Sequence, residues 1–354
     1  MVVRAAENIM HGPEHGVRLR LAPFDEDREL WLELVHASPG ATLYHREAWI
    51  KLLAQAYSLP LCIATLHRGS SVLAGCVFAR APLSNRFVSL PFSDSCPPLA
   101  SEPEAAQQLL SELSKEAPAR SSHEIRGIAG PAKWQDVGCF TQWRLSIDQP
   151  LARIGESLAQ NFKRNLRRAS NQRIRVEHGG DIKLLERFYE IQLESRRRLG
   201  LPSQPWRFFR LAHETFAADG NLDVWIAAEN GRDSASAVFL RDGDVIHYKW
   251  GARRSISNSS ANHLLFWNAI EEFAPNSRIL DLGRTDVRNH GLMRFKKELG
   301  ATVNPLPSSF YPRAPRQVSA EALTGGFAVG ARVWRRLPIF ATQLVSRAIY
   351  RFLV

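Results

Sequence analysis

Two segments in the second half of the chain carry polar side chains at positions where they could take part in chemistry. Residues 280–285, with the sequence LDLGRT, are predicted to form a strand that ends in a polar turn, and residues 292–299 a short basic element. Binding sites in α/β folds collect at the carboxyl ends of strands. We therefore expect Asp281 to Arg284 to lie at such an end, with the ammonium of Lys296 brought to the same cleft.

A third candidate is the basic run at residues 161–175, which holds six basic residues and no acidic one. Lys163, Arg164 and Arg167 project to nearly one side of a helix. Such a convergence of cations suits a phosphate or pyrophosphate, which arginine binds bidentately and lysine meets as a point charge. We therefore expect these three residues to bind substrate, whereas residues 196–198 are predicted to be a solvated helix face.

The motifs of several common chemistries are missing. The sequence contains no Gly-x-x-x-x-Gly-Lys-Ser/Thr, Gly-x-Gly-x-x-Gly, Gly-x-Ser-x-Gly or His-Glu-x-x-His. Its eleven histidines do not pair at ligand spacings, and its four cysteines include no Cys-x-x-Cys. We therefore expect no metal site and no serine nucleophile, so any chemistry must use positioning and cationic stabilisation.

The composition is that of an ordinary globular protein with a surplus of positive charge. Of the 354 residues, 45% are apolar and 23% are charged, which excludes a disordered chain, and the length predicts two domains. The net charge of +11 leaves nucleic acid, a membrane surface and an anionic substrate open as partners. No signal peptide and no membrane-spanning apolar stretch is found, so we expect a cytoplasmic protein.

The elements that would position these residues recur in the same order. A helix is predicted at residues 47–57 and a β-hairpin at residues 61–78, and the same succession returns at residues 206–216 and 224–240. The recurrence indicates a duplicated α/β unit. The segment at residues 302–312 is rich in proline and is predicted to be an exit segment.

We expect four parts along the chain. These are a flexible tail at residues 1–16, a first domain at 17–150, a second domain at 151–312 and a basic helical tail at 313–354.

The basic tail is predicted to be helical and broken at Pro338. The last 42 residues hold seven arginines against the single Glu321. Apolar side chains recur at steps of three and four, as at Phe340 and Leu344, with arginines on a neighbouring face. Two interpretations stay open: residues 323–354 lie on an anionic membrane surface, or the helix packs on its own domain with its arginines in water.

Short segments spread in order over roughly residues 17–340 resemble a known family. The sequence is similar to Fem-type (FemAB) peptidyltransferases and to the GNAT-superfamily acyltransferases of polysaccharide and exosortase clusters, including their BioF-like acetyltransferase domain. The matching segments are YHREAW at 44–49, VSLPF at 88–92, NFKRNLRRA at 161–169, LDLGRT at 280–285, RFKKELG at 294–300 and RRLP at 335–338.

The resemblance implies a fold and a reaction. The fold would be α/β (α+β), with two tandem GNAT-like domains joined across a groove, each a mixed, mostly antiparallel sheet flanked by helices. Such proteins transfer an acyl or aminoacyl group to an amine or hydroxyl of an anionic or lipid-linked precursor of the cell envelope. No cofactor would be bound permanently, and acyl-CoA or aminoacyl-tRNA would be the co-substrate. The coenzyme A loop of GNAT enzymes is not visible, so the donor stays open.

The resemblance also assigns residues. The catalytic Phe-Lys pair falls on Phe295 and Lys296, whose cation would stabilise charge on the reacting carbonyl. The substrate-binding candidates are Lys163, Arg164, Arg167, Asp281, Gly283, Arg284 and Arg294. Without the resemblance, Lys296 would be interpreted as a surface lysine beside Lys297.

A different class of function also fits the basic patches. The chain could be a catalytically silent double-GNAT protein that binds RNA or a membrane-associated assembly. For the enzyme, tRNA would be a partner only as the carrier of the donor group, and for the silent protein it would be a bound RNA. In both cases residues 323–354 would contact the inner leaflet of the membrane. No DNA partner is expected.

Overall fold

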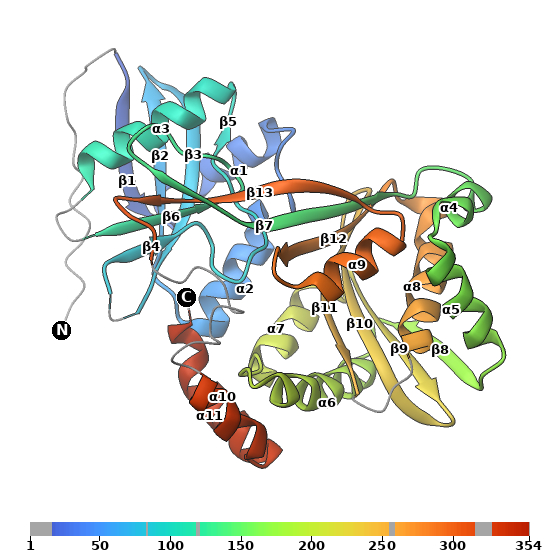
Figure 1. The fold of residues 1–354 in the computed structure, drawn as a ribbon. Helices are drawn as coiled ribbons and strands as arrows, with labels where there is room; N and C mark the ends of the chain where they lie inside the picture. Colours follow the sequence, from blue (N-terminus) through green and yellow to red (C-terminus); the bar gives the residue numbers. More distant parts are fainter. Residues whose placement is uncertain (1–15, 83, 118–120, 255–258, 316–327, 354) are drawn as a thin grey trace. The chain divides into compact units, whose positions relative to one another are not determined.

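The computed structural model describes residues 16–82, 84–117, 121–254, 259–315 and 328–353 (Figure 1). The chain divides into two compact units. Unit 1 consists of Met1–Cys139, Leu306–Val318 and Arg351–Val354, and unit 2 consists of Phe140–Pro305 and Ser319–Tyr350. The division falls inside the strand β7 (Gln135–Ser146) and not after residue 150, and residues 306–315 belong to unit 1.

Unit 1 is built on an antiparallel hairpin extended on both sides. The strands follow the order β1-β2-β3-β4-β6, with β5 paired to β3 and the end of β13 paired to β6. The strands are β1 (Arg18–Pro23), β2 (Leu61–Arg68), β3 (Ser71–Arg80), β4 (Arg86–Val88), β5 (Leu99–Ala100), β6 (Ser122–Arg126) and β13 (Thr302–Tyr311). The helices are α1 (Arg28–Ala37), η1 (Leu43–His45), α2 (Glu47–Tyr57) and α3 (Pro103–Glu116). Phe78, Leu109 and Ile125 are among the fully buried residues of its core.

Unit 2 repeats this plan with more helices. Its strands follow the order β7-β12-β11-β10-β9-β8. They are β7 (Gln135–Ser146, of which 140–146 belong to unit 2), β8 (Ile174–Gly179), β9 (Leu222–Glu229), β10 (Arg232–Asp242), β11 (Val245–Arg253) and β12 (Ile279–Asp286). The helices are α4 (Leu151–Ser157), α5 (Gln160–Ser170), α6 (Ile182–Leu199), α7 (Trp206–Phe216), α8 (Ser259–Phe273), η2 (Ala274–Asn276), α9 (His290–Glu298), α10 (Ala328–Arg336) and α11 (Ile339–Ile349), with η4 (Tyr350–Phe352) following.

The predicted recurrence of helix and hairpin is confirmed. The helices α2 and α7 begin and end where the 3.6-residue spacing places them, and each is followed by an antiparallel pair, β2 with β3 and β9 with β10. The prediction of an exit segment at residues 302–312 is wrong, because most of it forms β13. Proline lacks the backbone N–H donor but keeps its carbonyl acceptor, so it can still take part in a strand. The carbonyl of Pro307 accepts a hydrogen bond from the amide of Gly127 at 2.9 Å.

Helices cover both faces of the sheet in unit 2. One face packs on α8 and α5 through side chains such as Trp225 and Phe239. The other face meets α6 and α7, where the ring of Trp250 lies 5.5 Å from Phe208 and 5.3 Å from Phe209. Successive strand residues point to opposite faces, so both sets of apolar side chains are buried.

The strands β11 and β12 separate soon after they begin. They pair in parallel from Val245 and Ile279 to His247 and Asp281, where the ladder ends within the described part of the chain. The register of β12 shifts at this point, and Gly283 takes a positive φ of 71°, which a residue with a Cβ rarely adopts. Parallel neighbours that diverge leave room at their carboxyl ends for a ligand.

Candidate functional site

A pocket of about 640 Å³ opens in unit 2 on the side chains of five elements. It draws on α5, α6, β11, α8 and α9 and on the turn before α9. The lining residues are Asn161, Asn165, Ser195, Arg198, Leu199, Tyr248, Gly251, Ala252, Arg253, Asn262, His263, Asn289, Gly291, Leu292, Arg294, Phe295 and Glu298. This size suits a ligand of ordinary metabolite dimensions.

A β-bulge in β11 aims one tyrosine into the pocket. In the pairing with β10, Trp250 lies opposite Val238 and Tyr248 opposite Phe239, so Lys249 is the extra residue. The bulge places Tyr248 against Phe266 of α8 at 4.9 Å, whereas Trp250 packs on the opposite face. Bulges commonly redirect a side chain at functional sites. Burial raises the pKa of Tyr248 to about 12, so its hydroxyl stays protonated at neutral pH.

The hydroxyl of Tyr248 occupies space that only a glycine leaves free. A Cβ added at Gly251 would lie 1.7 Å from that oxygen. A glycine at position 251 is therefore needed for the hydroxyl to take this position.

We predict that Gly251→Ala displaces the Tyr248 hydroxyl and lowers catalytic turnover about 10²-fold, since a misplacement of about 1 Å can have that effect. Thermal unfolding should show a loss of about 1–3 kcal/mol from overpacking. The matched control is Gly155→Ala on α4, where an added Cβ meets Trp267 at an ordinary 3.5 Å. Equal turnover in the two variants would contradict the role given to Gly251.

Two amides of α5 face the pocket one helical turn apart. The Nδ2 atom of Asn165 lies 3.2 Å from Nε2 of His263, and the His263 ring packs between Phe162 at 4.5 Å and Phe295 at 5.4 Å. The other amide, Asn161, donates from Nδ2 to the carboxylate of Glu298 at 2.9 Å. The pocket wall is thus held by paired polar groups on an aromatic base.

The carboxylate of Glu298 is the acidic group of this wall. Burial disfavours its ionised form, but hydrogen bonds from Asn161 and Arg294 outweigh that effect and lower its pKa. Glu298 is therefore ionised at neutral pH.

Three arginines give the pocket a positive rim. The guanidinium of Arg198 donates to the carbonyl oxygen of Arg253 at 3.0 Å, and Arg294 donates from Nε to Glu298 at 2.9 Å. Burial and the nearby charge of Arg253 lower the pKa of Arg198 below its usual range. Cations gathered in this way suit an anionic ligand. The prediction that residues 196–198 form a solvated face is therefore wrong, because Arg196 and Arg197 also donate to carbonyls, of Pro202 and Leu337.

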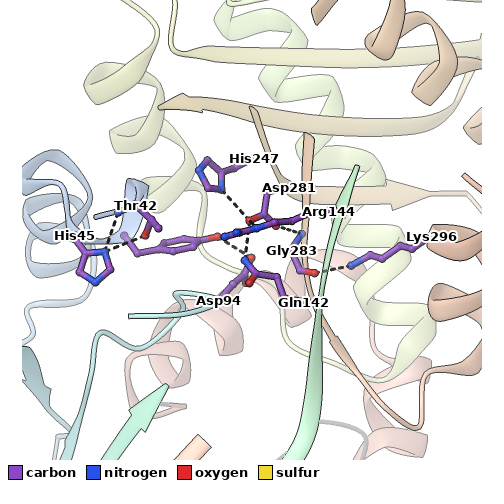
Figure 2. A network of polar contacts seen from close by, with 10 residues as sticks. Thr42, His45, Asp94, Gln142, Arg144, His247, Asp281, Gly283 and Lys296 are labelled. Atoms are coloured by element: carbon purple, nitrogen blue, oxygen red, sulfur yellow. Dashed lines mark hydrogen bonds and ion pairs between the residues drawn. The ribbon is translucent and has the colours of Figure 1, made fainter. Parts of the chain in front are cut away.

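A network of polar contacts surrounds the buried side chain of Asp281 at the divergence of β11 and β12 (Figure 2). The carboxylate of Asp281, 3% exposed, accepts from the amide of Gly283 at 2.8 Å, from Nε2 of Gln142 at 2.8 Å and from Nε of Arg144 at 3.2 Å. The Nδ1 atom of His247 lies 4.0 Å away. Asp281 and Gly283 therefore shape the bulge of β12 and are not among the pocket-lining residues.

Lys296 is buried, with only 1% of its surface exposed. Its Nζ donates to the carbonyl oxygen of Gly283 at 3.1 Å and to Oγ1 of Thr285 at 2.6 Å, which ties α9 to β12 (Figure 2). The interpretation of Lys296 as a surface lysine is wrong, whereas its neighbour Lys297 is exposed. Phe295 lines the pocket, and its ring lies 5.1 Å from Phe266.

The remaining predicted binding residues lie elsewhere in unit 2. Lys163 donates to the carbonyl of Glu156 at 2.9 Å, Arg164 donates to Asn161 Oδ1, and Arg167 is exposed. The guanidinium of Arg284 lies 4.4 Å over the ring of Phe140. Of the predicted site residues, the structure brings Phe295 and Arg294 to the pocket and places the other seven outside its lining.

Sequence reasoning missed Tyr248, His263, Asn161, Asn165 and Glu298. The segments that hold Tyr248 and His263 stand out in the sequence, but the bulge that turns Tyr248 inward leaves no signal there. The only local signal is the spacing of Asn161 and Asn165, four residues apart on a helix. In the described part of the chain, no group of three or more His, Cys, Asp or Glu side chains could hold a metal ion.

No curated protein matches the sequence. A family model described as an acetyltransferase (GNAT) domain matches residues 156–297, which include every pocket-lining residue except Glu298. We refer to residues 156–297, which match this family model, as the GNAT domain.

Solved structures extend the likeness beyond the GNAT domain. FemX shares 13% identity at a TM-score of 0.61, over 84% of this chain and 97% of FemX. A tandem GNAT protein from the clavulanic acid biosynthesis pathway shares 12% identity at 0.53, over 84% of this chain and 100% of its own. L-PGS from Bacillus licheniformis shares 10% at 0.52, over 88% of this chain and 98% of its own.

At these identities the solved structures establish the fold. Together with the GNAT domain they confirm the expected resemblance to FemAB-like, GNAT-superfamily acyltransferases, and they confirm the α/β class with two tandem GNAT-like domains.

Proposed function

We propose that this protein transfers an acyl or aminoacyl group to an amine or hydroxyl of an anionic or lipid-linked envelope precursor, and that the reaction takes place in the pocket of the GNAT domain. The observation that carries the proposal is the Tyr248 hydroxyl, which is neutral and belongs to a half-buried side chain that lines a pocket with three arginines, in a domain that matches this family. The pocket offers a proton donor, an ionised carboxylate and three arginines, so it can position both partners of a group transfer.

The proposed reaction is direct attack. The acceptor nitrogen or oxygen forms a bond to the donor carbonyl carbon, and the bond from that carbon to the carrier breaks. Tyr248 gives its proton to the leaving carrier and recovers one from the acceptor. The ionised Glu298 orients an acceptor amine, which carries hydrogen-bond donors.

In our proposal Lys296, which is not among the pocket-lining residues, acts on this reaction through its positive charge and not by direct contact. Its ammonium lies in a low-dielectric interior, where a charge acts more strongly than in water. Its bonds to Gly283 and Thr285 fix it before the substrate arrives, so no reorganisation is needed as the carbonyl oxygen becomes negative.

The three arginines of the rim could bind phosphate groups of either the donor or the acceptor. Acyl-CoA, the co-substrate of GNAT-fold proteins, and aminoacyl-tRNA both carry phosphates, as does a lipid-linked precursor. Arg198, Arg253 and Arg294 would bind these groups, with Lys163, Arg164 and Arg167 as further cations on α5.

We predict that Tyr248→Phe lowers kcat about 10²-fold or more, because it removes the proton donor and leaves the ring packing in place. KM for the donor should change little. Since the pKa of Tyr248 is about 12, the wild-type rate should show no alkaline decline from this group at ordinary pH. The control is Tyr189→Phe, a tyrosine of α6 that packs on Trp206 outside the pocket. A Tyr248→Phe enzyme as fast as the control would refute the assignment.

A further inference from the structure

The C-terminal helix α11 buries two hydroxyl side chains and exposes large apolar ones, and α10 exposes one large apolar side chain among arginines. On α11, Thr342 and Ser346 are buried at 3% and 1%, whereas Phe340 and Leu344 are exposed at 66% and 64%. On α10, Val333 is exposed at 55%. A helix that packs on its own domain ordinarily buries such apolar residues, so this arrangement calls for another partner.

Specific contacts hold the helices in this orientation. The amide of Ser203 donates to Oγ of Ser346 at 3.2 Å, and Arg197 donates to the carbonyl of Leu337 at 3.3 Å. Ala331 of α10 packs closely on Gly200, since a Cβ added at Gly200 would lie 2.8 Å from the Cβ of Ala331. Rotating α11 to bury Phe340 and Leu344 would break the first of these contacts.

Arginines share the exposed apolar face. Phe340, Leu344 and Arg347 are spaced at i, i+4 and i+7, which places them on one side of α11. On α10, Arg332 and Arg336 are exposed and are spaced at i and i+4, which places them on one side of the helix. Residues 328–353 hold five arginines and no acidic residue. We call the set Val333, Phe340, Leu344, Arg332, Arg336 and Arg347 the tail face.

We propose that the tail face lies on the surface of an anionic lipid bilayer, with Phe340 and Leu344 in the acyl-chain boundary and the arginines at the lipid phosphates. An RNA would account for the arginines and leave the exposed phenylalanine and leucine without a role. A second copy of the chain would bring arginines against arginines. A bilayer surface meets both kinds of side chain. None of the helices in the described part of the chain is long and apolar enough to span a membrane. The proposal stands independently of the acyl-transfer reaction.

The test is co-sedimentation of the full-length protein with phosphatidylcholine vesicles, with and without phosphatidylglycerol. We expect binding only when phosphatidylglycerol is present, and weakening with salt. The double variant Phe340→Glu and Leu344→Glu should bind about tenfold or more weakly, since it places two anions in the acyl-chain boundary. The control carries the same charge change on exposed apolar residues elsewhere in unit 2, Leu151→Glu and Val303→Glu, and should bind as wild type does.

A second variant, Arg332→Gln, Arg336→Gln and Arg347→Gln, should lose the preference for phosphatidylglycerol. Circular dichroism checks that each variant is folded. Vesicle binding by the Phe340/Leu344 variant equal to that of wild type would overturn the proposal. The proposal would also be overturned if the wild-type protein did not bind phosphatidylglycerol vesicles. Binding of RNA instead, or a dimer that the same two substitutions dissociate, would then identify the other partner.

Discussion

Replacing Lys296 by methionine is expected to lower the rate of acyl transfer by about 10²- to 10³-fold, the usual effect of losing one electrostatic stabiliser of an oxyanion. Methionine keeps the length and the apolar stem of lysine and removes only the charge and the donors. The loss should fall on kcat, because the proposed interaction strengthens only as the carbonyl oxygen becomes negative.

The substitution also has a structural effect that must be separated from the catalytic one. It deprives the Gly283 carbonyl and the Thr285 hydroxyl of a buried donor, which costs about 1–3 kcal/mol of unfolding free energy. Chemical denaturation measures that cost, and assays are run where the variant is fully folded. Lys297→Met, the exposed neighbour, is the matched control and should keep its activity. Full turnover by a folded Lys296→Met protein would remove Lys296 from the mechanism.

Replacing Glu124 by glutamine is expected to destabilise unit 1 by about 3 kcal/mol, as breaking a buried ion pair usually does. Glu124 is 4% exposed and lies between Arg86 and Arg126, with Arg126 Nε at 2.6 Å. Burial disfavours the carboxylate, but the two guanidiniums outweigh it and lower the pKa to about 2. The control, Glu112→Gln on the surface of α3, should change stability by less than about 0.5 kcal/mol.

The ion pairs of Glu124 also make the free energy of unfolding depend on pH. Because the folded pKa of Glu124 lies below its unfolded value of 4.5, the stabilisation is complete above that value and is lost as the pH falls toward about 2. Urea unfolding at a series of pH values should therefore show wild type and Glu124→Gln converging in the acid. A difference in unfolding free energy that stays constant from pH 7 to about pH 2 would show that another interaction stabilises this region.

Several elements of this fold are predictable from local spacing, whereas its site is not. The helices at Glu47–Tyr57 and Trp206–Phe216 follow from apolar side chains at steps of three and four, and the break at Pro338 follows from the missing donor of proline. These are properties of neighbouring residues. The pocket draws on five elements, and which of their side chains meet depends on tertiary packing.

Helix α5 is an example in which tertiary packing determines which side chains line the pocket. Its cations at positions 163, 164 and 167 stand out in the sequence, yet the buried Phe162 and Ala169 fix which side faces the domain. Asn161 and Asn165 then line the pocket, and the cations lie outside its lining. Likewise, the sequence Phe-Lys-Lys at 295–297 does not indicate which lysine is buried. The buried one, Lys296, is decided by hydrogen-bond acceptors at Gly283 and Thr285, which belong to the preceding strand β12.

The central claim is that the GNAT domain transfers an acyl group, and mass spectrometry of a lipid-linked precursor fraction tests it most directly. The full-length protein is incubated with that fraction and with acetyl-CoA or a pool of aminoacyl-tRNA. We predict a precursor species heavier by one acyl or aminoacyl group with one of these donors, formed at least about 10²-fold more slowly by Tyr248→Phe. Precursors unchanged in mass with both donors, or a product formed equally fast by Tyr248→Phe, would contradict it.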